Sequence, residues 1–247
     1  MTVIPVIDIR RGVAVHARRG ERARYGPIRS LLLPGADPFA LVRAYRTSLG
    51  STSIYVADLD AISGDGENLD VVSAMAASEP GLELFVDAGI RAVDGARALL
   101  RSGASKVILA SESLASLDEA SDLFAELGPI RAVFSIDLQH RKVVWRDGSS
   151  ESTDPYEVAA RLPPIGFLDA IVLEMERIGT GGGTDATFIG RLALAAPGVR
   201  LIVGGGIRTV EEILQLKRAG AAGVLLATAL HDGAINAAGL ARLGVAR

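Results

Sequence analysis

Short runs of β-branched and aliphatic residues alternate along the chain with longer segments rich in Ala and Leu. The short runs are typical of buried strands, and the longer segments space their apolar positions as helices do. The predicted strands cover residues 3–8, 53–57, 83–87, 106–110, 132–137, 169–173, 200–204 and 223–227. Eight strands that each precede a helix indicate an α/β fold with a parallel sheet.

Local motifs mark the starts of several predicted helices. Asp37-Pro38 and Asp154-Pro155 each place a capping carboxylate before a proline of the first turn. Residues 116–119 and 209–212 fit the capping box. No linker or low-complexity tract divides the chain, so residues 1–247 are predicted to form a single domain.

The chain resembles itself when it is shifted by 117 residues. Residues 84–111 then align without a gap with residues 201–228, and 13 of these 28 positions are identical. We therefore predict a (βα)8 TIM barrel with a twofold half-barrel repeat, its halves covering roughly residues 1–128 and 129–247. An open doubly wound sheet is the alternative, but no Gly-x-Gly-x-x-Gly turn follows the first strand.

Composition excludes several classes of function. The chain is 49% hydrophobic and carries a net charge of −3, which gives no basic surface for nucleic acid. Absence of cysteine excludes disulfides, thiolate nucleophiles and iron–sulfur clusters. Three histidines far apart in sequence, His16, His140 and His231, predict no metal site, and no cofactor is implied. Without a signal sequence or an apolar run long enough to cross a bilayer, we expect a soluble cytoplasmic protein.

An aspartate ends the first predicted strand, and another ends the fifth. Asp8 and Asp137 occupy these places, and strands one and five face each other in an eight-stranded barrel. An acid and a base on opposite walls can move a proton between neighbouring carbons of a bound sugar, which is aldose–ketose isomerisation. We predict Asp8 and Asp137 to be catalytic; capping of the following loops is the alternative.

Glycines and a threonine follow the seventh and eighth predicted strands. Backbone N–H groups at these positions commonly hold a phosphate in such barrels, and glycine lets the backbone approach the anion. Tight turns that serve only the fold are the alternative. The residues expected to bind the phosphate of a small-molecule substrate are Gly205, Gly206, Ala227 and Thr228.

The first half differs from the second at the equivalent place. Gly89, Arg91 and Ser111 match the second half, but Asp87 stands where the second half has Gly204. A carboxylate repels a phosphate dianion. We expect a strong phosphate site in the second half and a weak or altered one in the first, where Asp87 receives a cationic or hydroxyl-bearing part of the substrate.

Two pairs of acidic residues, each separated by one residue, end the second and sixth predicted strands. The pairs are Asp58 with Asp60 and Glu174 with Glu176. Side chains two residues apart lie on one side of a strand, so one member of each pair is expected to point into the barrel mouth. The alternative is a salt bridge to one of three arginines, Arg91, Arg177 or Arg208.

A long segment, residues 16–35, separates the first strand from the first helix. Loops of this length are usually functional lids or disordered segments. Its arginines can hold anionic groups, with His16, Arg22 and Tyr25 as candidate substrate contacts. A solvated charged loop is the alternative.

These motifs resemble the HisA/HisF family of sugar-phosphate barrels of histidine biosynthesis. The similar segments are residues 6–8, 12–15, 37–38, 56–60, 87–91, 135–137, 174–180 and 203–208. The resemblance implies that Asp8 and Asp137 are the acid/base pair. It also implies that two phosphate sites hold a bisphosphorylated ribonucleotide and that the segment with Arg177, Gly179 and Thr180 lines the active site. HisA members isomerise an aminoaldose to an aminoketose.

The chain also departs from the HisA pattern. Leu173 replaces a threonine, Ile178 replaces an aspartate, and Ala110-Ser111 and Ala227-Thr228 replace Gly-Thr or Gly-Ser pairs. Residues 16–30 and 229–233 are instead similar to a HisA-related subfamily of methylotrophs and methanogens. That resemblance implies a role in tetrahydromethanopterin or methanofuran metabolism.

Three functions follow from these observations. The first is an isomerase or related lyase acting on a sugar phosphate, within one-carbon cofactor biosynthesis. The second is the histidine-pathway isomerase, phosphoribosylformimino-aminoimidazole carboxamide ribotide isomerase. The third is a barrel that binds a phosphorylated ligand without catalysis. The expected partner is a phosphorylated small molecule, with no nucleic acid and no membrane, and the oligomeric state stays open.

Overall fold

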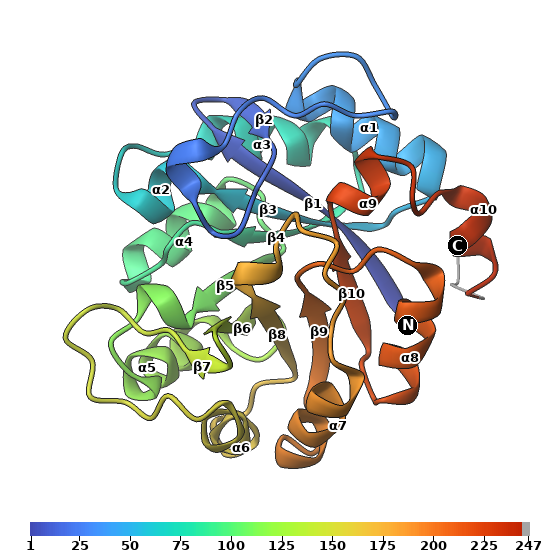
Figure 1. Cartoon of the computed structure of the whole chain (residues 1–247). Coiled ribbons are helices and arrows are strands. Elements are labelled where there is room, and N and C mark those ends of the chain that lie inside the picture. The colour runs from blue at the N-terminus through green and yellow to red at the C-terminus, as the bar shows by residue number, and fades with distance from the viewer. Residues whose placement is uncertain (244–247) are drawn as a thin grey trace.

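The computed structural model describes residues 1–243 and contains a closed barrel of eight parallel strands with helices between them (Figure 1). The barrel strands are β1 (Thr2–Arg10), β3 (Ser53–Asp58), β4 (Glu83–Asp87), β5 (Lys106–Ala110), β6 (Ala132–Gln139), β8 (Asp169–Glu174), β9 (Arg200–Gly204) and β10 (Gly223–Leu226). Pairing of β10 with β1, where Thr2 faces Gly223, closes the sheet. The predicted TIM barrel and its eight strands are confirmed. Residues 244–247 of the expected second half lie outside the described residues.

Helices cover the outside of the barrel. The longer ones are α1 (Pro38–Leu49), α3 (Leu69–Ser78), α4 (Val93–Arg101), α5 (Leu117–Leu127), α6 (Pro155–Ile165), α7 (Ala186–Ala195) and α8 (Val210–Arg218). Short elements lie at the strand ends and the carboxyl end: η1 (Arg22–Arg24), α2 (Leu59–Ser63), η2 (Ser111–Ser113), η3 (Met175–Arg177), α9 (Thr228–His231) and α10 (Ala237–Ala241). The short elements η1, α2, η2, η3 and α9 follow strands at the rim where the site forms.

Two hairpins extend the barrel beyond the sequence prediction. β1 and β6 do not end at Asp8 and Asp137 but continue for two more residues and pair with β2 (Val13–Val15) and β7 (Lys142–Val143). The hairpin turns use the left-handed region, with φ of 50° at Arg11 and 51° at His140. The prediction of strand ends at the two aspartates was therefore wrong. The hairpins lift the chain above the rim after each aspartate.

The core has two layers. Side chains such as Ile4, Phe85, Ile108 and Ile202 fill the inside of the barrel. A larger cluster packs the outer face of the strands against the helices, and Phe134 is fully buried in it. Branched aliphatic residues dominate both layers, as is usual for this fold. The cavity described below lies above the inner layer.

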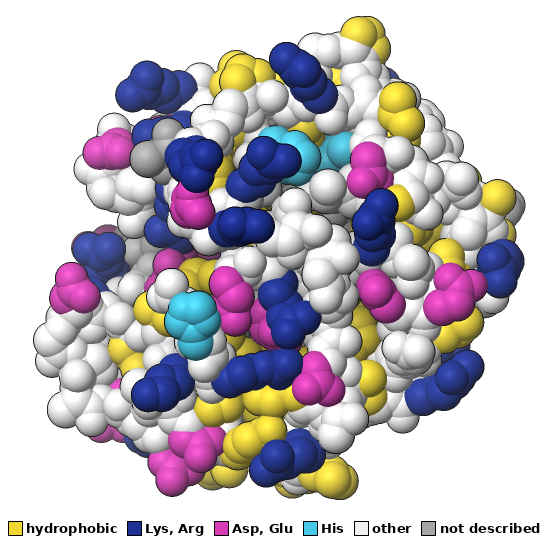
Figure 2. Space-filling model, in the orientation of Figure 1, with side chains coloured by type: hydrophobic (Ala, Val, Ile, Leu, Met, Phe, Trp, Pro, Cys, Tyr) yellow, Lys and Arg dark blue, Asp and Glu magenta, His cyan; other side chains and the backbone are white. Residues whose placement is uncertain are grey.

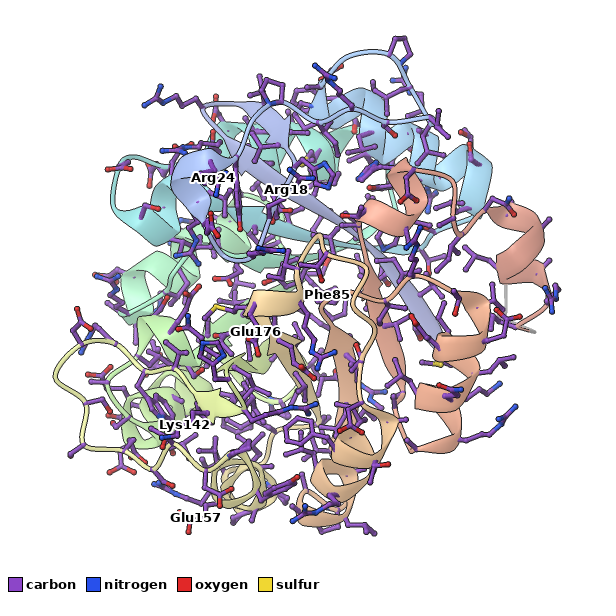
Figure 3. The ribbon with its side chains drawn as sticks, viewed as in Figure 1. Arg18, Arg24, Phe85, Lys142, Glu157 and Glu176 are labelled. Carbon is purple, nitrogen blue, oxygen red and sulfur yellow. The ribbon has the colours of Figure 1, made fainter. Side chains whose placement is uncertain are left out.

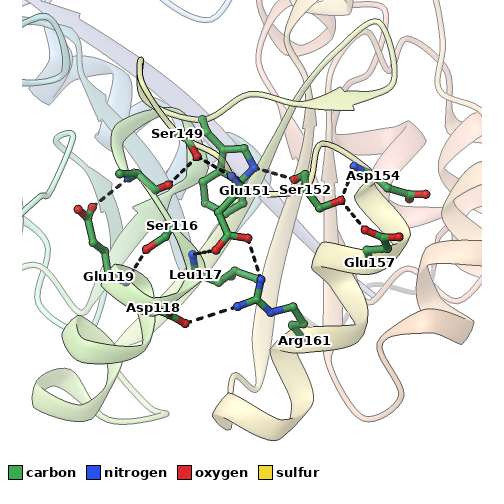
Figure 4. Close-up of polar contacts among 12 residues, drawn as sticks. Ser116, Leu117, Asp118, Glu119, Ser149, Glu151, Ser152, Asp154, Glu157 and Arg161 are labelled. Carbon is green, nitrogen blue, oxygen red and sulfur yellow. Dashed lines mark hydrogen bonds and ion pairs between the residues drawn. The ribbon is translucent and has the colours of Figure 1, made fainter.

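The segment between β7 and α6 is held on the outside of the barrel, as Figure 4 shows. Glu151 accepts a hydrogen bond from Arg161 of α6 at 2.7 Å and one from the Leu117 N–H of α5 at 3.4 Å. The Ser149 hydroxyl donates to the Ala115 carbonyl at 2.6 Å. These contacts join α5 to α6 across the segment.

Within residues 1–243 no helix has both the length and the apolar character that a bilayer crossing needs.

We predict that the two matching helix caps contribute similarly to stability. The carboxylates of Asp37 and Asp154 accept the N–H groups of Phe39 and Tyr156 at 3.1 and 2.8 Å. Asp37→Ala and Asp154→Ala should each lower the free energy of unfolding by about 1 kcal/mol, because each leaves a helix-end N–H uncapped. Urea denaturation measures the loss.

Asp70→Ala provides the matched control, because Asp70 lies in the first turn of α3 without a capping bond. It should change the free energy of unfolding by less than about 0.5 kcal/mol. Losses in the two cap variants no larger than in this control would contradict the prediction.

Candidate active site

A cavity of about 320 Å³ opens at the carboxyl ends of the barrel strands. Its wall combines apolar residues with ionisable side chains from β1, β3 and β4, from the turns after β5, β9 and α9, and from the segment after β2. The ionisable and phenolic groups that the argument below uses are Asp8, Arg22, Tyr25, Tyr55, Asp87 and Glu112. This is the end at which barrel enzymes build their active sites.

Asp8 lines the cavity with an unengaged carboxylate. Within the part of the chain that the structure describes, the carboxylate makes neither a side-chain hydrogen bond nor an ion pair. Burial raises its pKa from 3.8 to about 7, the charge of Arg22 opposes that shift, and Asp87 adds to it. Such a group changes its protonation state near neutral pH.

Asp137 lies at the equivalent place on β6 but in different surroundings. Its carboxylate accepts hydrogen bonds from the Ser135 hydroxyl at 2.7 Å, the Glu112 N–H at 3.3 Å and the Ser111 hydroxyl at 3.4 Å. Only 2% of the residue is exposed, and it is absent from the cavity wall. Burial, followed by the charges of Glu112 and Asp87, raises its pKa well above the usual range. The structure thus places Asp8 in the cavity wall, whereas hydrogen bonds hold Asp137 outside that wall.

Several wall residues were missing from the predicted site, among them Tyr55 and Glu112. The Tyr55 hydroxyl donates to Asp87 at 3.1 Å, and Glu112 forms an ion pair with Arg22. Burial and the charge of Glu112 raise the pKa of Asp87 to about 6. The repeat could have pointed to Glu112, because its counterpart in the second half, Ala229, carries no charge. Tyr55 was hidden among the apolar residues of a strand.

The expected phosphate cradle of the second half lies on the cavity wall. Gly205, Gly206, Ala227 and Thr228 all line it. The Thr228 hydroxyl lies 2.9 Å from Nε2 of His16, which itself does not line the cavity. The glycines also serve the fold, since a side chain at Gly205 would lie 2.7 Å from the Glu174 carbonyl. Close packing and a cradle are both compatible with this geometry.

The matching residues of the first half lie elsewhere. Gly89 and Arg91 border a separate surface depression beside α4, and the fully buried Ser111 hydroxyl accepts the Asp137 N–H at 3.0 Å. The structure therefore does not bring Gly89, Arg91 and Ser111 to the cavity.

Neither acid-x-acid pair points into the barrel mouth, which corrects the expectation from sequence. Asp58 caps α2 and, like Asp60, accepts a hydrogen bond from Asn68. Glu174 forms ion pairs with Arg177 at 2.6 Å and Arg141 at 3.4 Å. The middle residues Leu59 and Met175 line the cavity instead. The alternation fails because the chain leaves the strand and enters a helical turn at each pair.

Residues 16–35 pack over the cavity. Arg22 and Tyr25 reach the wall, whereas Arg18, Arg19 and Arg24 border a second depression at the rim. Figure 2 shows Lys and Arg side chains gathered over this part of the molecule, and Figure 3 labels Arg18 and Arg24. The side chains of this segment therefore divide between the cavity and solvent.

The segment is bonded to two other rim loops. The Arg19 N–H donates to the Ile178 carbonyl at 2.8 Å, and the Leu31 N–H donates to the His231 carbonyl at 2.8 Å. Gly179 and Thr180 also line the cavity, while Arg177 donates to the Gly183 carbonyl at 2.7 Å and so braces their loop. Arg177 thus holds this loop in place without lining the cavity.

The fold and cavity define a (βα)8 barrel with its polar site at the carboxyl ends of the strands, the arrangement of barrel enzymes. The chain belongs to the family described as Histidine biosynthesis protein, whose sequence profile matches residues 2–236. The resemblance to the HisA/HisF family is thereby confirmed.

Relatives of known and unknown function cover nearly the whole chain. The 1-(5-phosphoribosyl)-5-((5-phosphoribosylamino)methylideneamino)imidazole-4-carboxamide isomerase of Myxococcus xanthus is 30% identical over 98% of each chain. The isomerase of that name from Thermus thermophilus is 29% identical over 96% of this chain and 97% of its own. An uncharacterized protein of Methanocaldococcus jannaschii is 27% identical over 96% of both chains. These comparisons do not confirm the narrower resemblance to the subfamily of methylotrophs and methanogens.

We predict that stability falls as pH rises from about 4 to about 7. Folded Asp8 has a pKa of about 7 against an ordinary 3.8, so between these values the folded chain binds more protons than the unfolded chain. Stability is therefore fully present below the unfolded pKa and is lost toward the folded one. One such group contributes at most about 1.4 kcal/mol per pH unit.

Urea denaturation of wild type and Asp8→Asn at pH 5, 6, 7 and 8 measures this dependence. The variant should lose less stability over the range and exceed the wild type at pH 8. Asp70→Asn, an exposed change, should leave the slope intact. If the free energy of unfolding of Asp8→Asn falls with pH as steeply as that of the wild type, Asp8 is not the cause of the pH dependence.

Proposed function

We propose that the chain is an isomerase that converts a phosphorylated aminoaldose to the corresponding aminoketose. The observation that carries the proposal is the unengaged carboxylate of Asp8 in the cavity wall, with its pKa raised to about 7. A group with a pKa near the working pH can both accept and return a proton. The names of the relatives, isomerases at about 30% identity, support the reaction class.

The reaction needs only proton transfers and no redox step. An acid gives a proton to the ring oxygen as the ring opens to a protonated imine, and Asp8 takes the proton from the second carbon, so that a neutral enol conjugated to the nitrogen forms. Asp8 then returns the proton to the first carbon while the enol O–H proton goes back to the acid, which gives the ketone and restores both groups, so atoms and electrons balance. Asp137, whose pKa burial and the charges of Glu112 and Asp87 raise well above its usual range, is the candidate acid for ring opening, although it lies outside the cavity wall.

The second half supplies the candidate phosphate site. Its support comes from Gly206 and Thr228, which line the cavity beside the start of α9. Within residues 1–243 the Gly206 N–H has no hydrogen-bond acceptor. A phosphate there would place the sugar carbons toward Asp8 across the barrel mouth.

Two substrates are candidates. The histidine-pathway compound is favoured by the printed names of the relatives and is the first to test. A substrate in tetrahydromethanopterin or methanofuran biosynthesis is favoured by Leu173 and Ile178. Both line the cavity, where the HisA pattern has hydroxyl and carboxyl groups. A smaller or less polar substrate suits these apolar contacts.

We predict that Asp8→Asn and Asp137→Asn each lower kcat by roughly 10²- to 10⁴-fold, because an amide cannot exchange the proton. The measurement follows the relatives' substrate and simpler N-substituted 5-phosphoribosylamines in D2O by NMR. Conversion and deuterium entry at the carbons next to the nitrogen report turnover.

Asp94→Asn, an exposed change on α4, should leave the rate unchanged. Wild-type turnover in Asp8→Asn would contradict the proposal. Wild-type turnover in Asp137→Asn alone would leave Asp137 as a structural hydrogen-bond centre. Phosphate-ligand binding without turnover or deuterium exchange of any of these compounds would instead favour a non-catalytic barrel.

A further inference from the structure

The two halves of the barrel present different residues to the cavity at equivalent positions. In the second half Gly205, Gly206 and Thr228 line it, and Gly204 does not. In the first half the pattern reverses: Asp87, the counterpart of Gly204, lines the cavity, and the counterparts of the other three do not. The second half thus carries the candidate phosphate cradle, and the first half of the same molecule carries an altered copy of it.

The altered copy has lost its free backbone donors. The Gly89 N–H donates to the carboxylate of Asp87 at 3.1 Å, and the Glu112 N–H donates to the carboxylate of Asp137 at 3.3 Å. Their counterparts in the second half, the N–H groups of Gly206 and Ala229, have no acceptor within residues 1–243. Carboxylates of the chain itself hold the positions that phosphate oxygens would occupy.

Charge acts in the same direction. Asp87 and Glu112 face the first-half end of the cavity, and the ion pair of Glu112 with Arg22 engages a guanidinium at that end. A phosphate dianion entering there would meet the carboxylate of Asp87 at short range, where the protein interior screens charge weakly. The first-half end therefore disfavours an anion for two reasons. Its backbone N–H groups already donate to carboxylates of the chain, and the Asp87 carboxylate repels negative charge.

We propose that this barrel selects substrates with a single phosphate, held by the second half, and that Asp87 is the residue that excludes a second phosphate. The ligand class is a monophosphorylated sugar whose other end is not phosphorylated. The inference rests on the proposed function in taking the ligand to be a sugar phosphate, and of the two candidate substrates it disfavours the histidine-pathway compound, which carries two phosphoribosyl groups. It concerns binding, so it can be tested without turnover.

The experiment compares wild type with Asp87→Gly, which restores the residue of the second half. Crystals of each are soaked in the same concentration of inorganic phosphate. Wild type should hold phosphate at Gly206 and Thr228 only, whereas the variant should gain a second at the first-half end of the cavity, in the space of the lost Asp87 carboxylate, where the Gly89 N–H is freed. Calorimetric titration with the relatives' bisphosphorylated substrate should show at least roughly tenfold tighter binding to the variant, since one repelling charge is gone.

Three further variants keep the test decisive. Asp87→Asn removes the charge but retains a side chain that can accept the Gly89 N–H, so it should tighten binding less than Asp87→Gly and serves if the glycine variant does not fold. Gly206→Ala, whose added carbon would lie 3.0 Å from the Arg177 carbonyl, should lose the second-half phosphate. Asp94→Gly should bind as wild type.

The proposal is overturned if wild type binds phosphate in both halves, or if removing the Asp87 carboxylate leaves the affinity for the bisphosphate unchanged. Wild-type crystals that hold phosphate in neither half would likewise overturn the proposal. Failure of the isomerase proposal looks different, because it shows as absent proton exchange while this difference in phosphate binding persists.

Discussion

Negative charge enclosed at the barrel mouth is the constraint on which the site depends. Asp8, Asp87 and Asp137 take no part in the ion pairs found within residues 1–243, and Arg22 is paired with Glu112. Burial accordingly raises the pKa of each of the three aspartates. Folding alone does not require such an arrangement, since it costs stability as the pH rises. Carboxyl groups held in this state are typical of functional sites.

The fold was predictable because its signals are local and repeated. Each barrel strand begins within one residue of the predicted range, and Asp37 and Asp154 cap the helices expected of them. The hairpin after β6 was missed because its turn places His140 and Arg141, which are not glycines, at positive φ, and such residues give little sign of a turn. The turn after β1 holds Gly12 at a φ of 75°, a hairpin signal that the predicted strand end at Asp8 did not take into account.

The site was predictable only in part from the repeat, and it was misjudged where the direction of a side chain decided. Asp87 and the Gly205-Gly206 pair, which the repeat had marked, lie on the wall, as does Asp8 of the first strand. Gly89 and Ser111 were marked by the same repeat but do not line the cavity. Asp58 and Glu174 were misjudged because the strand period ends where a helical turn begins, which reverses which side chain faces inward. No sequence pattern separated Tyr55 from its apolar neighbours in the strand.

The two aspartates illustrate how a duplicated half acquires two roles. Ser135 precedes Asp137 by two residues and donates to its carboxylate, whereas Val6 stands at the same place before Asp8 and lines the cavity as an apolar wall. The hydroxyl ties one carboxyl into a network, and the valine leaves the other without a partner. Two carboxyl groups in different surroundings can hold different protonation states at one pH. In this barrel the neighbours of each aspartate, more than its position on the strand, determine which proton transfer it can perform.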